Sequence, residues 1–198
     1  MLPRLKPLSS KRVSIVTVLD IGSSKVVCMI GRLTPVSGRT HSIEILGIGH
    51  QKSRGIKAGV ISDMDAVENS VRLAVDAAER MAGVTVESLI VNVTAGRLSS
   101  ETHSASVNLG GHEIAAGDLA KVVNAATRQS QLNERAILHA LPSSYTRDGE
   151  RGIRDPAGMY GDMLGVDMHV LTADRAPLKN LELSINRAHL TVEAMVAT

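Results

Sequence analysis

The chain has 198 residues, of which 43% are hydrophobic and 21% are charged. It can therefore bury a core, and it is not a disordered polar tail. Its only aromatic residues are two tyrosines, which leaves little for stacking on nucleic-acid bases. One cysteine, Cys28, excludes an internal disulfide framework and a cysteine-based zinc site. No apolar run approaches the roughly 18 residues of a membrane-spanning helix.

The net charge of +2 hides an uneven distribution. Residues 1–12 contain four basic residues and no acidic one, and without these four the 22 basic residues become 18 against 20 acidic ones. We therefore expect residues 1–12 to form a basic flexible arm ahead of a slightly acidic folded part. Such a folded part argues against a nucleic-acid partner. The apolar run after the arm stops at Asp20 without a small-residue cleavage site, so it predicts a buried strand and not a signal peptide.

The first half of the folded part predicts three strands in succession, then a helix and a fourth strand. The predicted strands are 13–19, 26–33, 42–51 and 88–94, with a turn at 22–24 and a loop at 34–40. The helix is expected to begin at Ser62, whose spacing to Asp65 approximates a capping box, and to stop at Gly83. Its core-facing residues at helical spacing are Val67, Val71, Ala74, Val75 and Ala78. The β-β-β-α-β order is typical of a ribonuclease-H-like half-domain.

After Gly96 the sequence becomes polar and alternating, which indicates a sheet with one wet face. We predict a strand at 98–109, a turn at 110–111, a helix at 118–130, extended segments at 136–141 and 144–147, a loop at 148–161 and a strand at 163–173. Pro142 separates the two extended segments as an edge or a bend. This order, strand, helix, strand, strand, describes a compact α+β insert. A helix with Pro177 in its first turn and an apolar face of Leu178, Leu181, Leu183 and Ile185 follows, and then a strand at 190–197.

The strongest candidate site is the segment Val18–Lys25, with the sequence VLDIGSSK. A buried strand delivers the carboxylate of Asp20 to a tight turn of Gly22, Ser23 and Ser24. Hydroxyl and backbone N–H groups of such a turn can wrap phosphate oxygens, and Asp20 would hold Mg²⁺ through water. The same residues are also good turn formers, so a plain hairpin is the alternative. The segment is not a P-loop, because GxxxxGK[ST] is absent.

Several motifs place this site in a family context. Asp20–Lys25 resembles the first phosphate loop of the superfamily of actin, Hsp70 and sugar kinases. Four further segments resemble segments of the bacterial cell-division protein FtsA family, in the same order. These segments are 53–63 (SRGIKAGVISD), 141–145 (LPSSY), 152–161 (GIRDPAGMYG) and 168–173 (MHVLTA). Together the matches run from about residue 13 to the end.

The resemblance implies an α/β fold. It consists of an actin- or ribonuclease-H-like subdomain, with a mixed sheet and flanking helices, that carries an inserted α+β strand-helix-strand-strand (SHS2) subdomain. In these terms residues 13–94 correspond to the first part of subdomain 1A and residues 95–173 to the SHS2 insert, subdomain 1C. Residues 174–198 correspond to the return to subdomain 1A, before the second lobe.

The resemblance also implies a function as a division scaffold. The complete protein of this family binds ATP with little turnover, polymerises like actin and links FtsZ filaments to the cytoplasmic face of the inner membrane. Its insert contributes to self-association and to recruiting late division proteins such as FtsN. The carried-over nucleotide contacts are Asp20, Gly22, Ser23, Ser24 and Lys25, with Mg²⁺ near Asp20. The second phosphate loop, the second lobe and the membrane helix of the family have no counterpart here, so we expect weak or no ATP binding by this chain alone.

Two other functions stay open at this point. A phosphotransferase of the same superfamily, such as a sugar kinase, would need a catalytic aspartate, and no second motif supplies one. A truncated fragment without function would leave its final strand as an uncovered edge. No catalytic residue is predicted: the seven histidines are scattered, Cys28 lies within a predicted strand as a small core residue, and the charges around Arg147–Arg154 alternate in sign as in a solvated loop.

Overall fold

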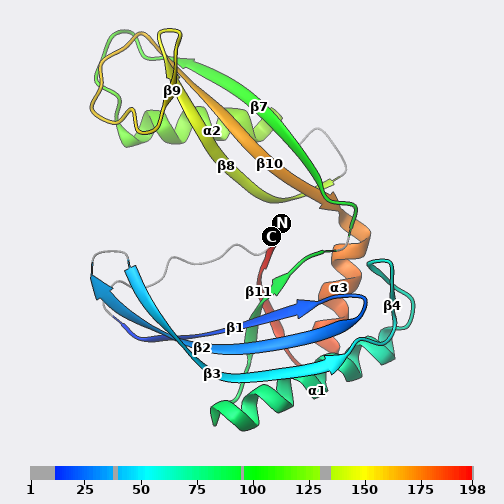
Figure 1. Ribbon diagram of the computed structural model, residues 1–198. Coiled ribbons are helices and arrows are strands. Elements are labelled where there is room, and N and C mark those ends of the chain that lie inside the picture. The colour runs from blue at the N-terminus through cyan, green and yellow to red at the C-terminus, as the bar shows by residue number, and fades with distance from the viewer. Residues whose placement is uncertain (1–11, 38–39, 95, 130–134, 198) are drawn as a thin grey trace. The chain divides into compact units, whose positions relative to one another are not determined.

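The computed structural model describes residues 12–37, 40–94, 96–129 and 135–197 (Figure 1). Most of the basic arm expected at residues 1–12, and the tip of the loop expected at 34–40, lie outside these residues. The chain divides into two compact units, residues 1–96 with 175–198, and residues 97–174. We refer to them as the main unit and the inserted unit.

The main unit is built on a five-stranded sheet in the order β11-β6-β1-β2-β3. Its strands are β1 (Ser14–Ile21), β2 (Lys25–Ser37), β3 (Thr40–Lys52), β6 (Ser88–Asn92) and β11 (Thr191–Val196). The first three form the predicted antiparallel meander, and β6 and β11 join in parallel. The predicted loop at 34–40 is wrong in its first part. There β2 continues to Ser37, because pairing with β3 overrides the turn propensity of Pro35 and Ser37.

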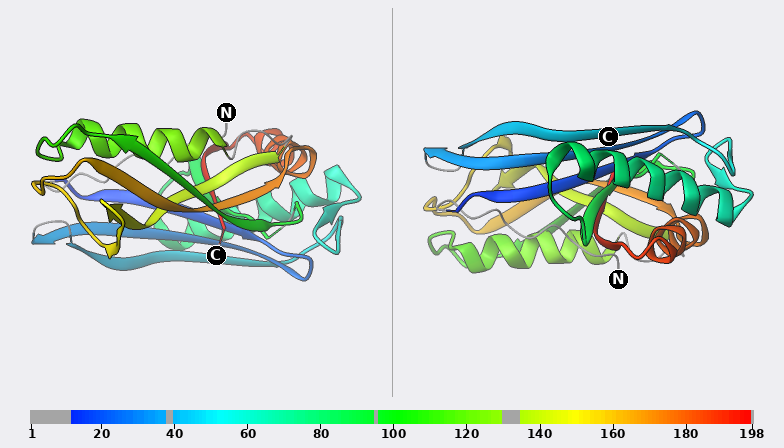
Figure 2. Two further views of the ribbon diagram at one scale, coloured as in Figure 1. Left: turned by 90° about the horizontal axis from the view of Figure 1, so that it is seen from above. Right: turned by 90° about the horizontal axis from the view of Figure 1, so that it is seen from below.

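Helix α1 (Met64–Ala82) lies across one face of this sheet (Figure 2). Its N-cap is Asp63, which has the extended backbone of a cap and accepts a hydrogen bond from the Ala66 N–H at 3.0 Å. The predicted capping role of Ser62 is therefore wrong by one residue, and its hydroxyl instead donates to the Gly55 carbonyl at 3.2 Å. Gly83 ends the helix with a left-handed φ of 66°, as predicted.

Two glycines of β3 allow α1 to approach the sheet closely. A Cβ atom at Gly49 would lie 1.7 Å from the Ala74 carbonyl oxygen, and one at Gly47 would lie 2.2 Å from the Ala78 carbonyl oxygen. The core-facing residues predicted for α1 are all buried, and so is Cys28. Small residues on the strand thus determine where the helix backbone lies.

The main unit also contains the short strands β4 (Ile56–Lys57) and β5 (Val60–Ile61), which pair antiparallel, and helix α3 (Arg175–Arg187). Arg187 of α3 forms ion pairs with Asp65 and Glu68 of α1. The apolar face predicted for α3 is correct except for Leu183. That residue is 52% exposed, and Ser184 is buried beside it instead, because a helix turn places residue 184 and not 183 in line with Leu181.

The inserted unit is a four-stranded sheet in the order β7-β10-β8-β9, with α2 packed on β7 and β10. Its elements are β7 (Ser99–Asn108), α2 (Ala116–Gln129), β8 (Arg135–Arg147), β9 (Glu150–Ile153) and β10 (Met163–Asp174). Three expectations need correction. The two segments around Pro142 are one strand with a bulge, because pairing with β10 continues on both sides of it. The predicted loop at 148–161 contains β9, and α2 begins two residues before Asp118.

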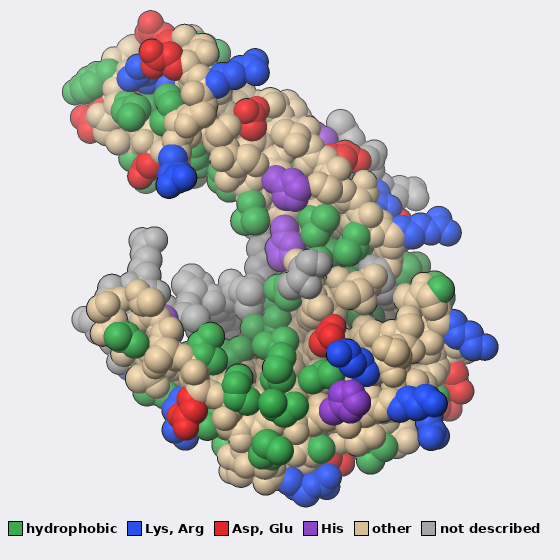
Figure 3. Space-filling view, viewed as in Figure 1, with side chains coloured by type: hydrophobic (Ala, Val, Ile, Leu, Met, Phe, Trp, Pro, Cys, Tyr) green, Lys and Arg blue, Asp and Glu red, His purple; other side chains and the backbone are tan. Residues whose placement is uncertain are grey.

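The second face of the main sheet, which we call the open face, is aliphatic over most of its area. Side chains alternate along each strand, so this face carries the residues that α1 does not cover. Large apolar side chains on it are well exposed, including Met29 at 37%, Ile48 at 45%, Ile45 at 52% and Ile43 at 69%. Figure 3 shows such side chains gathered over β1–β3.

Candidate functional site

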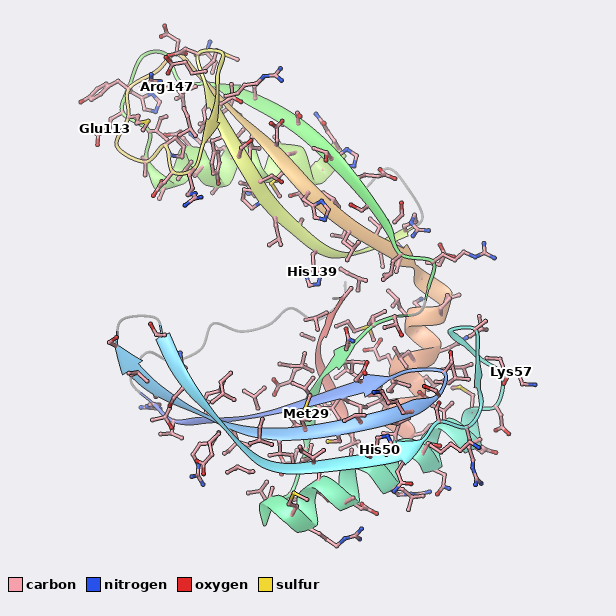
Figure 4. The ribbon with its side chains drawn as sticks, in the orientation of Figure 1. Met29, His50, Lys57, Glu113, His139 and Arg147 are labelled. Atoms are coloured by element: carbon pink, nitrogen blue, oxygen red, sulfur yellow. The ribbon has the colours of Figure 1, made fainter. Side chains whose placement is uncertain are left out.

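The candidate site lies at one end of the open face, where β1 runs into the turn at residues 22–24. Strand register places Asn92, Asp20, Val27 and His50 in one row across β6, β1, β2 and β3. The neighbouring row, Ile90, Val18, Met29 and Ile48, is entirely apolar. Figure 3 shows an acidic, a basic and a histidine side chain close together beside the apolar area, and Figure 4 marks Met29 and His50. The row next to the turn thus combines three polar side chains, Asn92, Asp20 and His50, with one apolar one.

Asp20 is the last polar residue of β1 and is half-buried. Its Oδ1 accepts a hydrogen bond from Asn92 Nδ2 at 3.0 Å. Sequence reasoning missed Asn92, although a signal was present: a polar residue closes the otherwise apolar run of β6. Because β1 and β6 are parallel neighbours, their carboxyl ends meet at the same edge of the sheet.

Three backbone or hydroxyl contacts hold the turn. The Gly22 N–H donates to the Lys25 carbonyl at 2.9 Å, which closes the hairpin. The Ser53 N–H, directly after β3, donates to the Ser24 carbonyl at 3.0 Å. The Gly59 N–H, between β4 and β5, donates to the Ser23 hydroxyl oxygen at 3.1 Å. The turn is therefore fixed from both sides by segments distant in sequence.

Gly22 is not required by the turn itself. Its φ is not left-handed, and a Cβ atom there would lie 3.4 Å from the Lys25 carbonyl oxygen, an ordinary contact. A side chain would therefore fit the hairpin, and what glycine adds is bare backbone beside the Asp20 carboxylate.

The residues present fit a magnesium–phosphate group. A carboxylate and an amide oxygen, from Asp20 and Asn92, are the oxygen ligands that Mg²⁺ prefers, with water completing an octahedral shell. Hydroxyl groups of Ser23 and Ser24 and the exposed ammonium of Lys25 suit phosphate oxygens. Within the described ranges, no group of three or more His, Cys, Asp or Glu side chains could hold a metal ion. Asp20, with water as the other ligands, is the residue that would hold the cation.

A small pocket of about 160 Å³ lies behind the turn. Its walls are mainly aliphatic, with Ile21, Ile61, Pro177 and Leu181 among them, and no charged residue lines it. It therefore lacks a cationic side chain for a phosphate group, and its few polar groups are those of Thr94, Asn180 and the backbone of Gly59.

The open side of the inserted sheet has a different chemistry. Asp167 accepts hydrogen bonds from the hydroxyl groups of Ser104 at 2.5 Å and Ser144 at 3.3 Å. Asp167, Ser104 and the neighbouring Gly165 line a shallow groove of about 260 Å³, together with Ser106, Thr146 and Arg151. The hydroxyl groups of this hydroxyl-rich face can donate and accept hydrogen bonds, so the face is suited to contacts with polar groups.

Two ionisable groups with shifted pKa values are structural. Asp118, 5% exposed in the first turn of α2, accepts hydrogen bonds from Lys121 at 2.9 Å and from the Ala115 N–H at 3.2 Å. His112 Nε2 lies 3.0 Å from the same carboxylate. These partners, Lys121 foremost, hold the pKa of Asp118 well below its usual range. Burial, with a smaller effect from the charge of Glu79, raises the pKa of the Cys28 thiol to about 12, so Cys28 is not a nucleophile.

The architecture and the turn define the class of the protein. The main unit has the mixed sheet of the ribonuclease-H-like, actin-like fold, and residues 95–172 match the family model for the SHS2 domain inserted in FtsA. A solved structure of the PilM-PilN type IV pilus biogenesis complex has the same fold, with a TM-score of 0.56 over 92% of this chain and 47% of that one, at 11% identity. Within the described residues, no helix is both long and apolar enough to cross a membrane.

Sequence comparison gives the family. Over 203 aligned residues the chain is 68% identical to the cell division protein FtsA of Agrobacterium fabrum, covering all of this chain and 46% of the relative. It is 32% identical to the FtsA of Pseudomonas aeruginosa over 178 residues, covering 90% of this chain and 42% of the relative. The chain therefore belongs to the FtsA family of cell-division proteins as a partial sequence. It spans about half the length of the curated relatives it matches.

Proposed function

We propose that the protein carrying this chain is a nucleotide-dependent division scaffold in which the turn at residues 22–24 binds the phosphates of Mg-ATP. The observation that carries the proposal is the Asp20–Asn92 hydrogen bond beside this turn. It holds a carboxylate at the carboxyl ends of two parallel strands, a frequent position for ligands in α/β sheets. When bound, Mg²⁺ would neutralise phosphate charge, while Ser23, Ser24 and Lys25 would orient the phosphate oxygens.

We assign no catalytic residue, in line with a role for the nucleotide in setting the conformation and the polymer state of the protein. For the 198-residue chain alone we expect weak or no Mg-ATP binding, because the turn offers few contacts and the family binds nucleotide between two lobes. A micromolar Kd for Mg-ATP on this chain, measured by calorimetry, would contradict that expectation.

The partners follow from the family and are part of the proposal. We assign self-association and recruitment of late division proteins such as FtsN to the inserted unit. Attachment to FtsZ filaments and to the cytoplasmic face of the inner membrane belongs to parts of the relatives that this chain does not match. The hydroxyl-rich face around Asp167 supports the first assignment, because it presents polar groups to solvent on a folded scaffold.

Asp20→Ala in the full-length protein tests the nucleotide site. We expect weaker Mg-ATP binding, by about tenfold or more, because the charged group next to the cation is removed. Nucleotide-dependent polymerisation should weaken in parallel, while far-UV circular dichroism stays unchanged. Glu87→Gln, at an exposed position outside the site, is the control. Normal polymerisation of Asp20→Ala with ATP would remove Asp20 from its assigned role.

A further inference from the structure

Lys25 and Lys52 face each other across β2 and β3. The two residues are direct partners in the antiparallel register, and both are exposed. Lys25 alternates with the buried Val26, and Lys52 follows His50 by two residues. Both lysines therefore project on the open face, the face that also carries Asp20.

Two ammonium groups at directly opposed positions repel each other. Directly opposed side chains on neighbouring strands have Cβ atoms only about 5 Å apart, and like charges there are unfavourable. Neither lysine forms an ion pair with any residue that the structure describes. The pair therefore favours an anion that carries more than one charge, since such an anion can contact both groups.

The position of Lys52 is fixed relative to the phosphate-binding turn. Ser53, the next residue, donates its N–H to the Ser24 carbonyl, so the end of β3 is tied to the turn. Lys25 is the first residue of β2 after the same turn, where its carbonyl accepts from Gly22. The two lysines thus lie beside each other next to the turn, on short, anchored segments. Lys57 lies in the β4–β5 hairpin, which also reaches the turn, through the Gly59 N–H and the Ser23 hydroxyl, but its partner across the hairpin is Val60 and not a second lysine.

We infer that Lys52 acts with Lys25 as a phosphate-contacting pair that makes this site selective for a polyphosphate of high charge, a nucleoside triphosphate over a diphosphate. The inference rests on the proposed function, because it places both ammonium groups on the phosphates of the nucleotide bound at the turn. It adds a second residue, distant in sequence from the turn, and a source of discrimination between nucleotide states.

The test uses the full-length protein with Lys52→Gln and, as a matched control, Lys57→Gln. Mg-ATP and Mg-ADP are titrated at low and at physiological salt. Lys52→Gln should weaken Mg-ATP binding by about fivefold or more, the effect of losing one charged hydrogen-bond donor at a solvated site. It should weaken Mg-ADP binding less, and reduce the salt dependence of Mg-ATP affinity. Lys57→Gln should stay within about twofold of the unsubstituted protein.

A second readout needs no nucleotide. Removing one of two repelling charges should raise the Tm of ligand-free protein at low salt, for Lys52→Gln and for Lys25→Gln alike, and the gain should vanish as salt screens the pair. Tripolyphosphate should then stabilise the unsubstituted protein more than either variant. Mg-ATP affinity of Lys52→Gln equal to that of Lys57→Gln would overturn this inference and leave the proposed function standing. Absence of Mg-ATP binding by the unsubstituted full-length protein would overturn both.

Discussion

Each of the two sheets of this chain is covered by a helix on one face, but the sheets differ in the chemistry of the other face. One face of the main sheet packs against α1, and one face of the inserted sheet packs against α2. The other face of the main sheet exposes Ile43, Ile45 and Ile48, whereas that of the inserted sheet presents hydroxyl groups around Asp167. An antiparallel sheet can leave one face in water, while sheets with parallel strands are usually covered on both faces. The uncovered face of the inserted sheet is polar, as is usual for a surface in contact with water. The open face of the main sheet is aliphatic, as is usual for a buried core. On the main face, Asp20, Lys25 and Lys52 lie together at the end that holds the candidate site.

The largest difference between the two units is expected in the free energy of unfolding when a glycine of each sheet is replaced by alanine, which adds one methyl group. Gly49→Ala places a Cβ atom 1.7 Å from the Ala74 carbonyl oxygen, and neither backbone can yield without moving α1. We expect a loss of about 3 kcal/mol or more in the free energy of unfolding. Gly165→Ala is the matched variant of the inserted sheet, where the nearest atom would be the Thr146 Cβ at 3.3 Å, and about 1 kcal/mol or less is expected. Urea unfolding of both variants measures the difference, and equal losses would contradict the close approach of α1 to β3.

The second largest effect is expected on the stability of the inserted unit at acidic pH. Asp118 has its pKa lowered in the folded state by Lys121, His112 and the Ala115 N–H. Such a group adds stability that is fully present above the pKa of an unfolded aspartate, about 3.9, and is lost as the pH falls below that value. Asp118→Asn should therefore lower Tm at pH 7 and flatten the decline of Tm between about pH 5 and pH 3. Thermal unfolding of both proteins across this range is the measurement, and parallel pH profiles would exclude the contribution of Asp118.

A smaller effect is expected on the open face. Ile48→Lys replaces an apolar side chain that is 45% exposed, so the free energy of unfolding should change by only about 0.5 kcal/mol. Binding of a hydrophobic dye by the 198-residue chain should fall, because the apolar area is interrupted at its centre. Ser106→Lys, at an exposed position of β7, is the control and should leave dye binding unchanged. Equal dye binding by the two variants would show that the exposed apolar area lies elsewhere.

The last prediction concerns the rate at which a thiol reagent labels Cys28, and it is measured on the unsubstituted protein. Cys28 is the sole cysteine, fully buried in the main sheet, with its thiol pKa raised to about 12. A thiol reagent should label it at least about a hundredfold more slowly in native protein than in urea-unfolded protein. Because the inserted unit contains no cysteine, the labelling rate reports opening of the main unit alone. Rapid labelling of the native protein would mean that β2 opens readily.

Periodicity predicted most of the fold because each element has one apolar face. The meander, α1 with its stop at Gly83, and the strand–helix–strand–strand order of the insert are all visible as repeats of two or three to four residues. The errors in the strands fall where longer-range pairing overrides local preference. Pro35 stays in β2 and residues 150–153 form β9, because each has a partner strand that the local sequence does not reveal. Ser62 lost the capping role because a better acceptor, Asp63, follows it directly.

The candidate site was predictable only in the part that is continuous in sequence. Asp20 and the turn could be found from one short segment, whereas Asn92, Ser53 and Gly59 reach the turn through strand pairing and loop contacts. Lys52 has no local signal either, since only the register of β2 against β3 sets it opposite Lys25. The roles of these residues in nucleotide binding stay predictions.

The inserted unit begins and ends on neighbouring strands. Ser99 of β7 pairs with Thr172 of β10, so the two ends of the unit are about one strand spacing, roughly 5 Å, apart. The unit therefore connects to the main unit through two ends that are as close together as those of a tight hairpin loop. Its insertion adds little to the loop-closure entropy that a short connection at the same place would cost the main unit. This makes the unit portable. Recombination between relatives could exchange it as one block. Replacing the unit by a short peptide that joins its two ends should leave the sheet of the main unit intact.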